Sequence, residues 1–256
     1  MILVVSDVHG AFPALRRVAE SGETLLILGD LANMTDYRTG EGAVATTFGH
    51  DLAVLAGEAR GEGDFEEMRR LWKAAVPDPD VGRQSIEQAI DLQYAEMRAA
   101  LEGGRGYVIH GNVDRPDRLV SALPPSFQYV HGETIDIGGV SFGFVGGGVR
   151  TPLRAVGEIE DDEMASILET IGPVEILCTH VPPAIDSLRR DVVTGRAERG
   201  SAPILDYLMR FQPRLHIFGD VHQPQATTWR VGSTRCQNVG YFRATGRALS
   251  LGDLDL

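Results

Sequence analysis

The stretch "MILVVSDVHGAFPALRRVAESGETLLILGD" (residues 1–30) decides the fold class, because it has the pattern of a strand, a helix and a second strand. Its two continuous apolar runs, "MILVVS" and "TLLILG", are typical of strands that a sheet buries on both faces. Between them, Pro13 suits the first turn of a helix and Gly22 follows the predicted helix end. An acidic residue, Asp7 or Asp30, follows each strand. Since the carboxyl ends of strands line the ligand crevice of open α/β sheets, this opening predicts an α/β fold with a site at that edge.

The segment from about residue 36 to residue 104 has a helical pattern instead. Asp64 has the character of a helix N-cap, and the apolar residues that follow it recur at helical spacing. The stretch "SIEQAIDLQYAEMRAALEGG" (85–104) predicts a second amphipathic helix, which Gly103 can end. The intervening "PDPD" predicts a break between these helices. We therefore interpret residues 36–104 as a helical insertion in a single domain that spans residues 1–256.

The remainder of the chain returns to short strands with helices between them. Two segments, "TIDIGGVSFGF" (134–144) and "ATTWRVGSTRCQNVG" (226–240), have the pattern of β-hairpins, the first with Gly138-Gly139 at its turn. Further strands are predicted at "VEILCTH" and "RLHIFGDVH", and helices near "EDDEMASILETIG" and "APILDYLMRF". The alternation of strands and helices supports the α/β class.

The composition argues against binding to nucleic-acid backbones or membranes. The net charge of the 256 residues is −12, whereas phosphate backbones are bound by basic patches. No apolar run approaches the roughly 20 residues that span a bilayer. The N-terminus has the pattern of a strand rather than a signal peptide, so we expect a cytoplasmic protein. Cys178 and Cys236 lie in strand-like runs and are predicted to be buried, reduced thiols.

Metal-binding residue types occur at five predicted strand ends. A single histidine or D-x-H tripeptide is common by chance and usually structural, but the joint pattern is much more specific. Paired divalent cations require hard oxygens and imidazoles, with one carboxylate free to bridge them. The candidate metal ligands are Asp7, His9, Asp30, Asn112, His180, Asp220 and His222.

In this combination the chain resembles the calcineurin-like metallophosphoesterase superfamily. The family motifs D-x-H, G-D, G-N-x-D, a strand-ending histidine and G-H-x-H correspond to "DVH", "GD", "GNVD", "CTH" and "GDVH", in order along the whole chain apart from the insertion. The resemblance implies a four-layer αββα sandwich of two mixed sheets flanked by helices. It also implies that Asp30 bridges two divalent ions, one held by Asp7, His9 and His222 and the other by Asn112, His180 and Asp220.

Two departures from the family pattern bear on the chemistry. Val113 stands where the family usually has a histidine that helps to protonate the leaving group or hold the phosphate. Small prokaryotic phosphodiesterases with a G-N-x-D loop also lack it, and the chain is closest to these in pattern. Asp220 stands where the family usually has histidine, and aspartate can still ligate a hard cation. The alternative is that Asp220 does not ligate and the second metal site is weak.

Further residues near these motifs are candidates for catalysis and substrate binding. Asn112 would stabilise the developing negative charge, and Asp114 would either orient a neighbouring ligand or form part of a turn. Arg115 and Arg150 are candidates for binding a phosphate oxygen. His50, in the insertion, is a candidate for the missing general acid.

The sequence thus predicts a dinuclear-metal-dependent phosphoesterase. It would hydrolyse small-molecule phosphodiesters, or esters with good leaving groups, by attack of a metal-bound hydroxide. We expect two divalent ions, with Mn²⁺ favoured over Fe, Zn, Mg, Ni or Co, and we consider the helical insertion a candidate homodimer interface. A phosphomonoesterase or protein phosphatase is one alternative, against which the missing histidine counts. A catalytically weak scaffold or adaptor of the same fold is the other, against which the complete ligand set counts.

Overall fold

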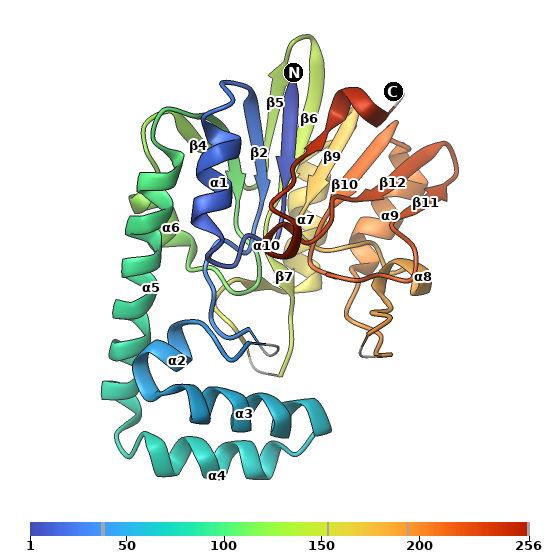
Figure 1. Ribbon diagram of the computed structural model, residues 1–256. Helices are drawn as coiled ribbons and strands as arrows, with labels where there is room; N and C mark the ends of the chain where they lie inside the picture. Colours follow the sequence, from blue (N-terminus) through green and yellow to red (C-terminus); the bar gives the residue numbers. More distant parts are fainter. Residues whose placement is uncertain (37–38, 153, 194, 255–256) are drawn as a thin grey trace.

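The computed structural model of the protein describes residues 1–36, 39–152, 154–193 and 195–254. In this part of the chain two mixed sheets pack face to face, and helices cover the outer face of each (Figure 1). The layers follow the order helix, sheet, sheet, helix. The predicted fold class, a sandwich of two mixed sheets flanked by helices, is confirmed.

The first sheet has the strand order β13-β1-β2-β3-β4, in which β1 to β4 are parallel and β13 pairs antiparallel with β1. Its strands are β1 (Ile2–Val5), β2 (Thr24–Leu28), β3 (Arg105–Ile109), β4 (Phe127–Tyr129) and β13 (Leu249–Ser250).

The second sheet has the order β11-β12-β10-β9-β6-β5, with antiparallel strands at both edges and parallel strands between them. Both edges are the predicted hairpins, β5–β6 and β11–β12. Its strands are β5 (Glu133–Ile137), β6 (Val140–Val145), β9 (Ile176–Thr179), β10 (Leu215–Phe218), β11 (Thr228–Val231) and β12 (Thr234–Asn238). The short strands β7 (Gly148–Val149) and β8 (Glu158–Ile159) form a separate parallel pair.

Burial on both faces explains the continuous apolar runs of the opening strands. Val5 and Leu25 point into the core beneath the helices, whereas their neighbours Val4 and Leu26 point into the core between the sheets. All four side chains are at most 1% exposed. Alternate residues of one strand thus enter different cores, as the two-residue period of a strand requires.

Helices on the outer faces complete the layers. The first sheet is covered by α1 (Phe12–Ala19), α5 (Pro79–Leu101) and α6 (Pro116–Ala122), and the second by α7 (Asp161–Ile171) and α9 (Ala202–Phe211). Shorter elements are α8 (Asp186–Arg189), α10 (Phe242–Thr245) and the 3₁₀ helix η1 (Leu251–Leu254). Every helix among the described residues is too short or too polar to span a lipid bilayer.

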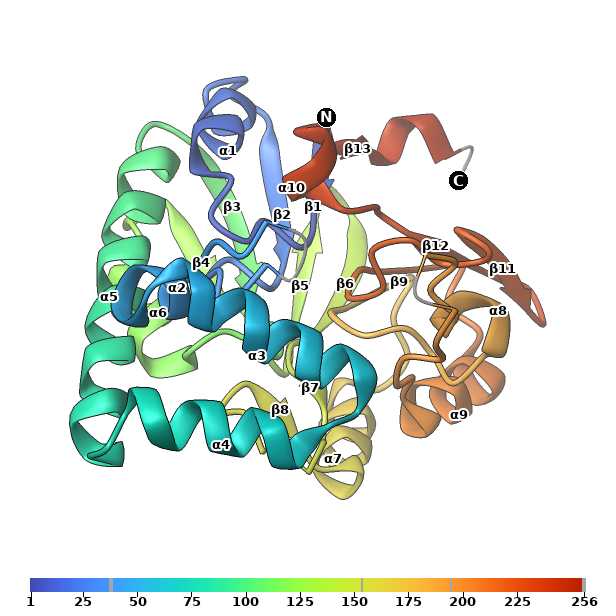
Figure 2. The same cartoon turned by 60° about the horizontal axis from the view of Figure 1, so that its bottom comes forward.

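The segment between β2 and β3 lies beyond the carboxyl ends of the strands. It contains α2 (Ala43–Phe48), α3 (His50–Glu62), α4 (Phe65–Ala75) and α5. Helices α3 and α4 run side by side across that edge, and α5 returns along the first sheet (Figure 2). The insertion therefore overhangs the edge at which the sequence places the metal ligands.

Candidate metal centre

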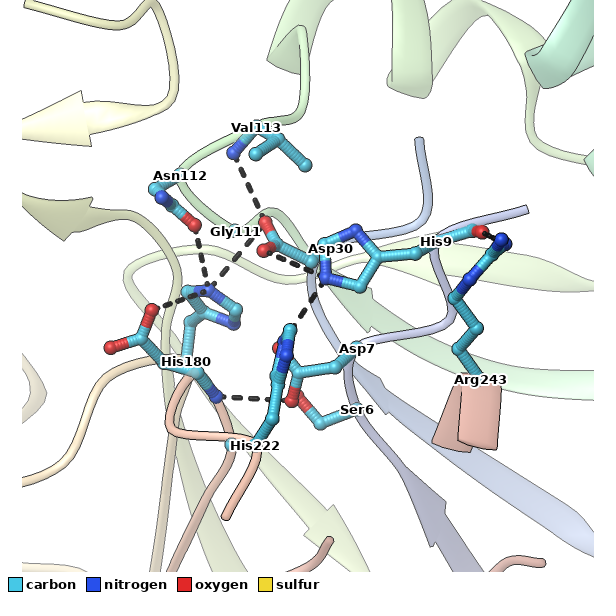
Figure 3. Close-up of polar contacts among 12 residues, drawn as sticks. Ser6, Asp7, His9, Asp30, Gly111, Asn112, Val113, His180, His222 and Arg243 are labelled. Atoms are coloured by element: carbon cyan, nitrogen blue, oxygen red, sulfur yellow. Dashed lines mark hydrogen bonds and ion pairs between the residues drawn. The ribbon is translucent and has the colours of Figure 1, made fainter. Parts of the chain in front are cut away.

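The predicted metal ligands come together from both sheets. Asp7, Asp30 and Asn112 follow β1, β2 and β3 of the first sheet, while His180 and Asp220 follow β9 and β10 of the second. Because parallel strands present their carboxyl ends at one edge, residues far apart in sequence meet there (Figure 3).

The backbone turns sharply at four of these ligand residues. Asp7, His9, Asp30 and Asp220 have φ angles of 58°, 40°, 53° and 66°, in the left-handed region. Aspartate, asparagine and histidine enter this region more readily than most other non-glycine residues. Such conformations persist where the surrounding structure enforces them, and they cluster at functional sites. Here, the amide of His9 donates to the carbonyl of Asp30 (2.8 Å), which holds two of these turns together.

Two glycines allow the first two ligand loops to approach. A Cβ atom on Gly29 would fall 2.5 Å from the backbone nitrogen of Gly111, so neither a side chain nor the φ of 95° at Gly29 suits another residue. The "GD" and "GN" pairs of the sequence are explained by this contact.

The ligand atoms form two groups that share Asp7. One group consists of Asp7, His9 and His222, the other of Asp7, Asp30 and His180, and within each group the ligand atoms lie within 4.8 Å of one another. Such distances suit donors arranged around a common cation. Both groups are made of carboxylate oxygens and imidazole nitrogens, which bind divalent first-row metals.

Asp30 lies between the two groups. Its Oδ2 is 3.5 Å from His9 Nε2, and its Oδ1 is 3.5 Å from His180 Nε2. The backbone amide of Val113 donates to Oδ1 over 3.0 Å and fixes the carboxylate (Figure 3). This position fits the bridging role that the resemblance implies for Asp30.

Asn112 and Asp220 lie on the side of the cluster that carries His180. Asn112 Oδ1 is 3.3 Å from His180 Nε2, and turning the amide by 180° lets its NH₂ group donate to both oxygens of Asp30. Asp220 Oδ1 is 3.7 Å from His180 Nε2, and the backbone amide of Asp220 donates to Asp7 Oδ2. All seven predicted ligands therefore belong to one cluster.

Burial makes the charges of this cluster costly. The pKa of Asp30 is raised to about 8 by burial, with Asp114 and Asp7 adding to the shift and His180 opposing it. Burial also raises the pKa of Asp220 to about 6. The pKa of His180 is raised to about 9, because three nearby carboxylates outweigh the burial that would lower it. Buried carboxylates in this arrangement need compensating positive charge, which divalent cations supply.

Two orphaned atoms support the same interpretation. Asp7 Oδ1 and His9 Nε2 are buried and have no hydrogen-bond partner among the described residues. The other ring nitrogen of His9, Nδ1, lies 3.3 Å from the carbonyl oxygen of Ala32, so Nε2 is left as the lone-pair donor. Both atoms belong to the same ligand group and face each other at 4.0 Å, and a cation between them would satisfy both.

Asp114 has a different role from the catalytic one that the sequence suggested. Its side chain is fully buried and does not face the cluster. Oδ1 accepts hydrogen bonds from the backbone amides of Leu31 and Ala32 and from the hydroxyl of Tyr94, and Oδ2 accepts one from the amide of Gly111. Because these partners occupy both oxygens, Asp114 positions the loops that carry Asp30 and Asn112, which is the orienting role among the two alternatives.

The candidate substrate arginines are engaged with carboxylates. Arg115 Nε donates to Glu87 (2.9 Å) and its NH1 to the carbonyl of Val113 (3.2 Å), and Arg150 Nε donates to Glu160 (2.8 Å). His50 Nε2 lies 2.9 Å from the carbonyl oxygen of Thr39.

Two residues near the C-terminus support the ligands and were not singled out from the sequence. The ring of Tyr241 stacks on His222 with a centroid distance of 3.8 Å and an interplanar angle of 3°. Arg243 donates to the backbone carbonyl of His9 and also to Asp36 and Glu41, at the start of the insertion. Their position directly after β12 was the available signal, since the other ligands also follow strands.

The fold and this cluster define a metal-dependent phosphoesterase. The chain belongs to the calcineurin-like phosphoesterase family, whose model matches residues 1–224. The predicted family resemblance is thereby confirmed. No curated protein sequence matches the chain.

Solved structures with similar folds have low sequence identity to this chain. The protein TT1561 of Thermus thermophilus is similar with a TM-score of 0.54 and 12% identity, over 97% of this chain and 96% of that one. An archaeal phosphodiesterase has a TM-score of 0.39 and 12% identity, over 98% and 94% of the two chains. The sulfate thiohydrolase SoxB of Thermus thermophilus has a TM-score of 0.38 and 11% identity, over 91% of this chain and 37% of that one.

Adding Mn²⁺ to chelator-treated protein should raise its thermal unfolding midpoint. A metal that binds only the folded state, at about 100 times its Kd, contributes about 2.7 kcal/mol, or roughly 5–10 °C for a chain of this size. Differential scanning calorimetry over a Mn²⁺ series measures the shift. An unchanged midpoint with Mn²⁺, Zn²⁺ and Fe²⁺ alike would contradict the assignment of a metal site.

Proposed function

We propose that the protein hydrolyses phosphodiesters, or phosphate esters with good leaving groups, at a dinuclear metal centre. The observation that carries the proposal is the position of Asp30, whose two oxygens face His9 and His180 in different halves of one cluster. A pair of ions bridged by a carboxylate is suited to in-line displacement at phosphorus.

The ligands divide between two ions. Bound divalent cations would supply the Lewis acidity that polarises a phosphoryl oxygen and lowers the pKa of water. We expect Mn²⁺ to support activity because the donor set is rich in oxygen. Asp7, His9 and His222 would hold the first ion, and Asn112, His180 and Asp220 the second.

The surrounding residues hold this donor set in a fixed arrangement. The amide of Val113 fixes Asp30, and the carbonyl of Leu28 lies 2.7 Å from His180 Nδ1, which directs Nε2 towards the cluster. The side-chain amide of Asn112 lies beside both residues, where it can stabilise charge that develops on phosphate oxygens.

The charge of the cluster favours a diester over a monoester. Asp7, Asp30 and Asp220 are three carboxylates, one more than the family pattern with histidine at position 220 contains. A phosphomonoester carries close to two negative charges near neutral pH, because its second pKa is about 6. A diester carries one, so it is repelled less by the additional carboxylate.

The residue at position 113 supports the same preference. Valine cannot donate a proton, and the imidazole of His50 is occupied by the carbonyl of Thr39. Without a general acid, the departing oxygen must carry its negative charge alone.

Hydrolysis of a series of phosphodiesters with different leaving groups tests the proposal. We expect turnover of diesters in preference to monoesters, with a rate that falls steeply as the leaving-group pKa rises. Val113→His should raise the rate for alkyl leaving groups by about 100-fold, the lower range of general-acid catalysis, and by much less for nitrophenyl esters.

The matched control is Val120→His, which places a histidine on an exposed position of α6. A shallow leaving-group dependence in the natural protein would mean that another side chain acts as the acid. Preferential hydrolysis of monoesters would favour the phosphomonoesterase alternative.

A further inference from the structure

The insertion contains an apolar pocket close to the metal centre. The pocket has a volume of about 600 Å³ and lies in the corner where α4 meets α5 (Figure 2). Its apolar walls include Phe48 at the end of α2, Trp72 and Val76 at the end of α4, and Ile86 on α5. Small-molecule pockets usually have 300–1,000 Å³ and mostly apolar linings, so its size and chemistry suit a ligand.

Aromatic rings form one wall of this pocket. Phe48 and Trp72 meet edge to face, with a centroid distance of 5.7 Å and an interplanar angle of 90°. Such a pair leaves ring surface available to stack on a planar ligand group. Trp72 belongs to a helix whose apolar face, on sequence grounds, would be expected only to pack against other helices.

The rim of the pocket is basic, although the chain has a net charge of −12. Lys73, Arg83 and Arg115 line it together with a single carboxylate, Glu87. Glu87 is already paired with Arg115 (2.9 Å) and Arg118 (3.1 Å). An anion with an apolar body therefore complements the pocket in both shape and charge.

The pocket is connected to the metal centre through the loop after β3. Arg115 lines the pocket, and its NH1 donates to the carbonyl of Val113. The amide of Val113 donates in turn to Asp30, at the middle of the ligand cluster. The same short loop thus forms the wall of the pocket and the edge of the reaction site.

We propose that this insertion pocket binds an aromatic, apolar non-leaving group of the phosphodiester substrate, while its basic rim attracts the phosphate. The proposal rests on the proposed diesterase function and specifies its substrate class. An apolar group is favoured over a nucleobase, because the polar groups of the pocket are confined to its charged rim. The heteroatoms of a base would find few partners against Phe48, Trp72, Val76 and Ile86.

Three diesters with the same 4-nitrophenolate leaving group test this specificity. Their second substituents are methyl, phenyl and thymidine-5′-yl. We expect kcat/KM for the phenyl diester to exceed that for the methyl diester by about 10- to 100-fold, the effect of burying one aromatic group. Trp72→Ala, which removes the stacking surface, and Ile86→Trp, which fills the pocket, should each bring the ratio close to one. Leu92→Ala, at an exposed position of the same helix α5, should leave the ratio at its natural value.

A binding measurement separates the pocket from catalysis. The chain has two tryptophans, so Trp229→Phe leaves Trp72 as the sole one. Phenylphosphonate should change the fluorescence of Trp72 in a saturable manner, whereas methylphosphonate and inorganic phosphate should not. If no diester is hydrolysed but Trp72 responds to phenylphosphonate, the proposed function fails and the pocket assignment stands.

Three results would overturn the inference. One is a phenyl-to-methyl ratio close to one in the natural protein. Another is Trp72 emission that phenylphosphonate leaves unchanged. The third is a preference for the thymidine diester that Trp72→Ala abolishes, which would make the pocket a nucleobase site.

Discussion

Replacing Asp30 with asparagine should lower kcat/KM for a nitrophenyl phosphodiester by about 1,000-fold, equivalent to about 4 kcal/mol of transition-state stabilisation. Asparagine has nearly the same shape, so the hydrogen bond from the amide of Val113 to Oδ1 can be kept. The substitution removes one negative charge and replaces one of the two oxygens that face His9 and His180. Elemental analysis should therefore find at most one tightly bound metal ion per chain instead of two.

The matched control is Asp186→Asn, because this aspartate on α8 has a side chain that is 76% exposed. We expect the control to keep both metal content and activity. If Asp30→Asn kept two metal ions and full turnover, the bridging assignment would be wrong. Circular dichroism would establish that the variant remains folded.

Replacing Asp114 with alanine should lower the free energy of unfolding by about 3–5 kcal/mol, the range for removing one partner of a buried charged network. The substitution leaves several buried donors unsatisfied, namely the amides of Leu31, Ala32 and Gly111 and the hydroxyl of Tyr94. Urea denaturation of the natural and variant proteins measures the difference. Activity should fall as well, because Asp114 holds the loops that carry Asp30 and Asn112.

Asp117→Ala is the control, since Asp117 lies three residues further along and is exposed on α6. It should change stability by no more than about 0.5 kcal/mol, as is usual for surface substitutions. Comparable losses in the two variants would mean that the hydrogen bonds of Asp114 contribute little.

The strand framework and its ligand-bearing ends were predictable because both depend on local sequence. Each ligand stands within a few residues of an apolar run whose burial determines its place in a sheet. The two hairpins were also predictable, since Gly138 and Gly139 have the positive φ angles that their turn requires. The family motifs then associated ligands that local pattern alone could only place one at a time.

The helices of the insertion were predicted less completely. Helix α5 begins at Pro79, inside the "PDPD" stretch read as a break, because Asp78 caps it through the amides of Asp80 and Val81. Helices α2 and α3 were not predicted, and the weak separation of apolar and polar faces in "HDLAVLAGEARGE" explains the second of these.

The role of Asp114 could not be derived from the sequence. Its partners include Leu31, Ala32 and Tyr94, which lie 83, 82 and 20 residues away. A carboxylate in a G-N-x-D loop is equally compatible with catalysis and with anchoring until those partners are known. The stacking of Tyr241 on His222 depends in the same way on contacts that local pattern does not encode.

The left-handed conformation of Asp7, His9, Asp30 and Asp220 restricts which amino acids evolution can try at these positions. Most residues would incur about 1–2 kcal/mol there, whereas aspartate, asparagine and histidine enter this region more easily. Glutamate and cysteine, otherwise good metal ligands, are disfavoured by the backbone before any metal is bound. An exchange between histidine and aspartate, such as the one that separates Asp220 from the family pattern, stays within the permitted set. Drift in metal preference within this lineage is therefore expected to proceed through a small vocabulary of side chains that the main chain selects in advance.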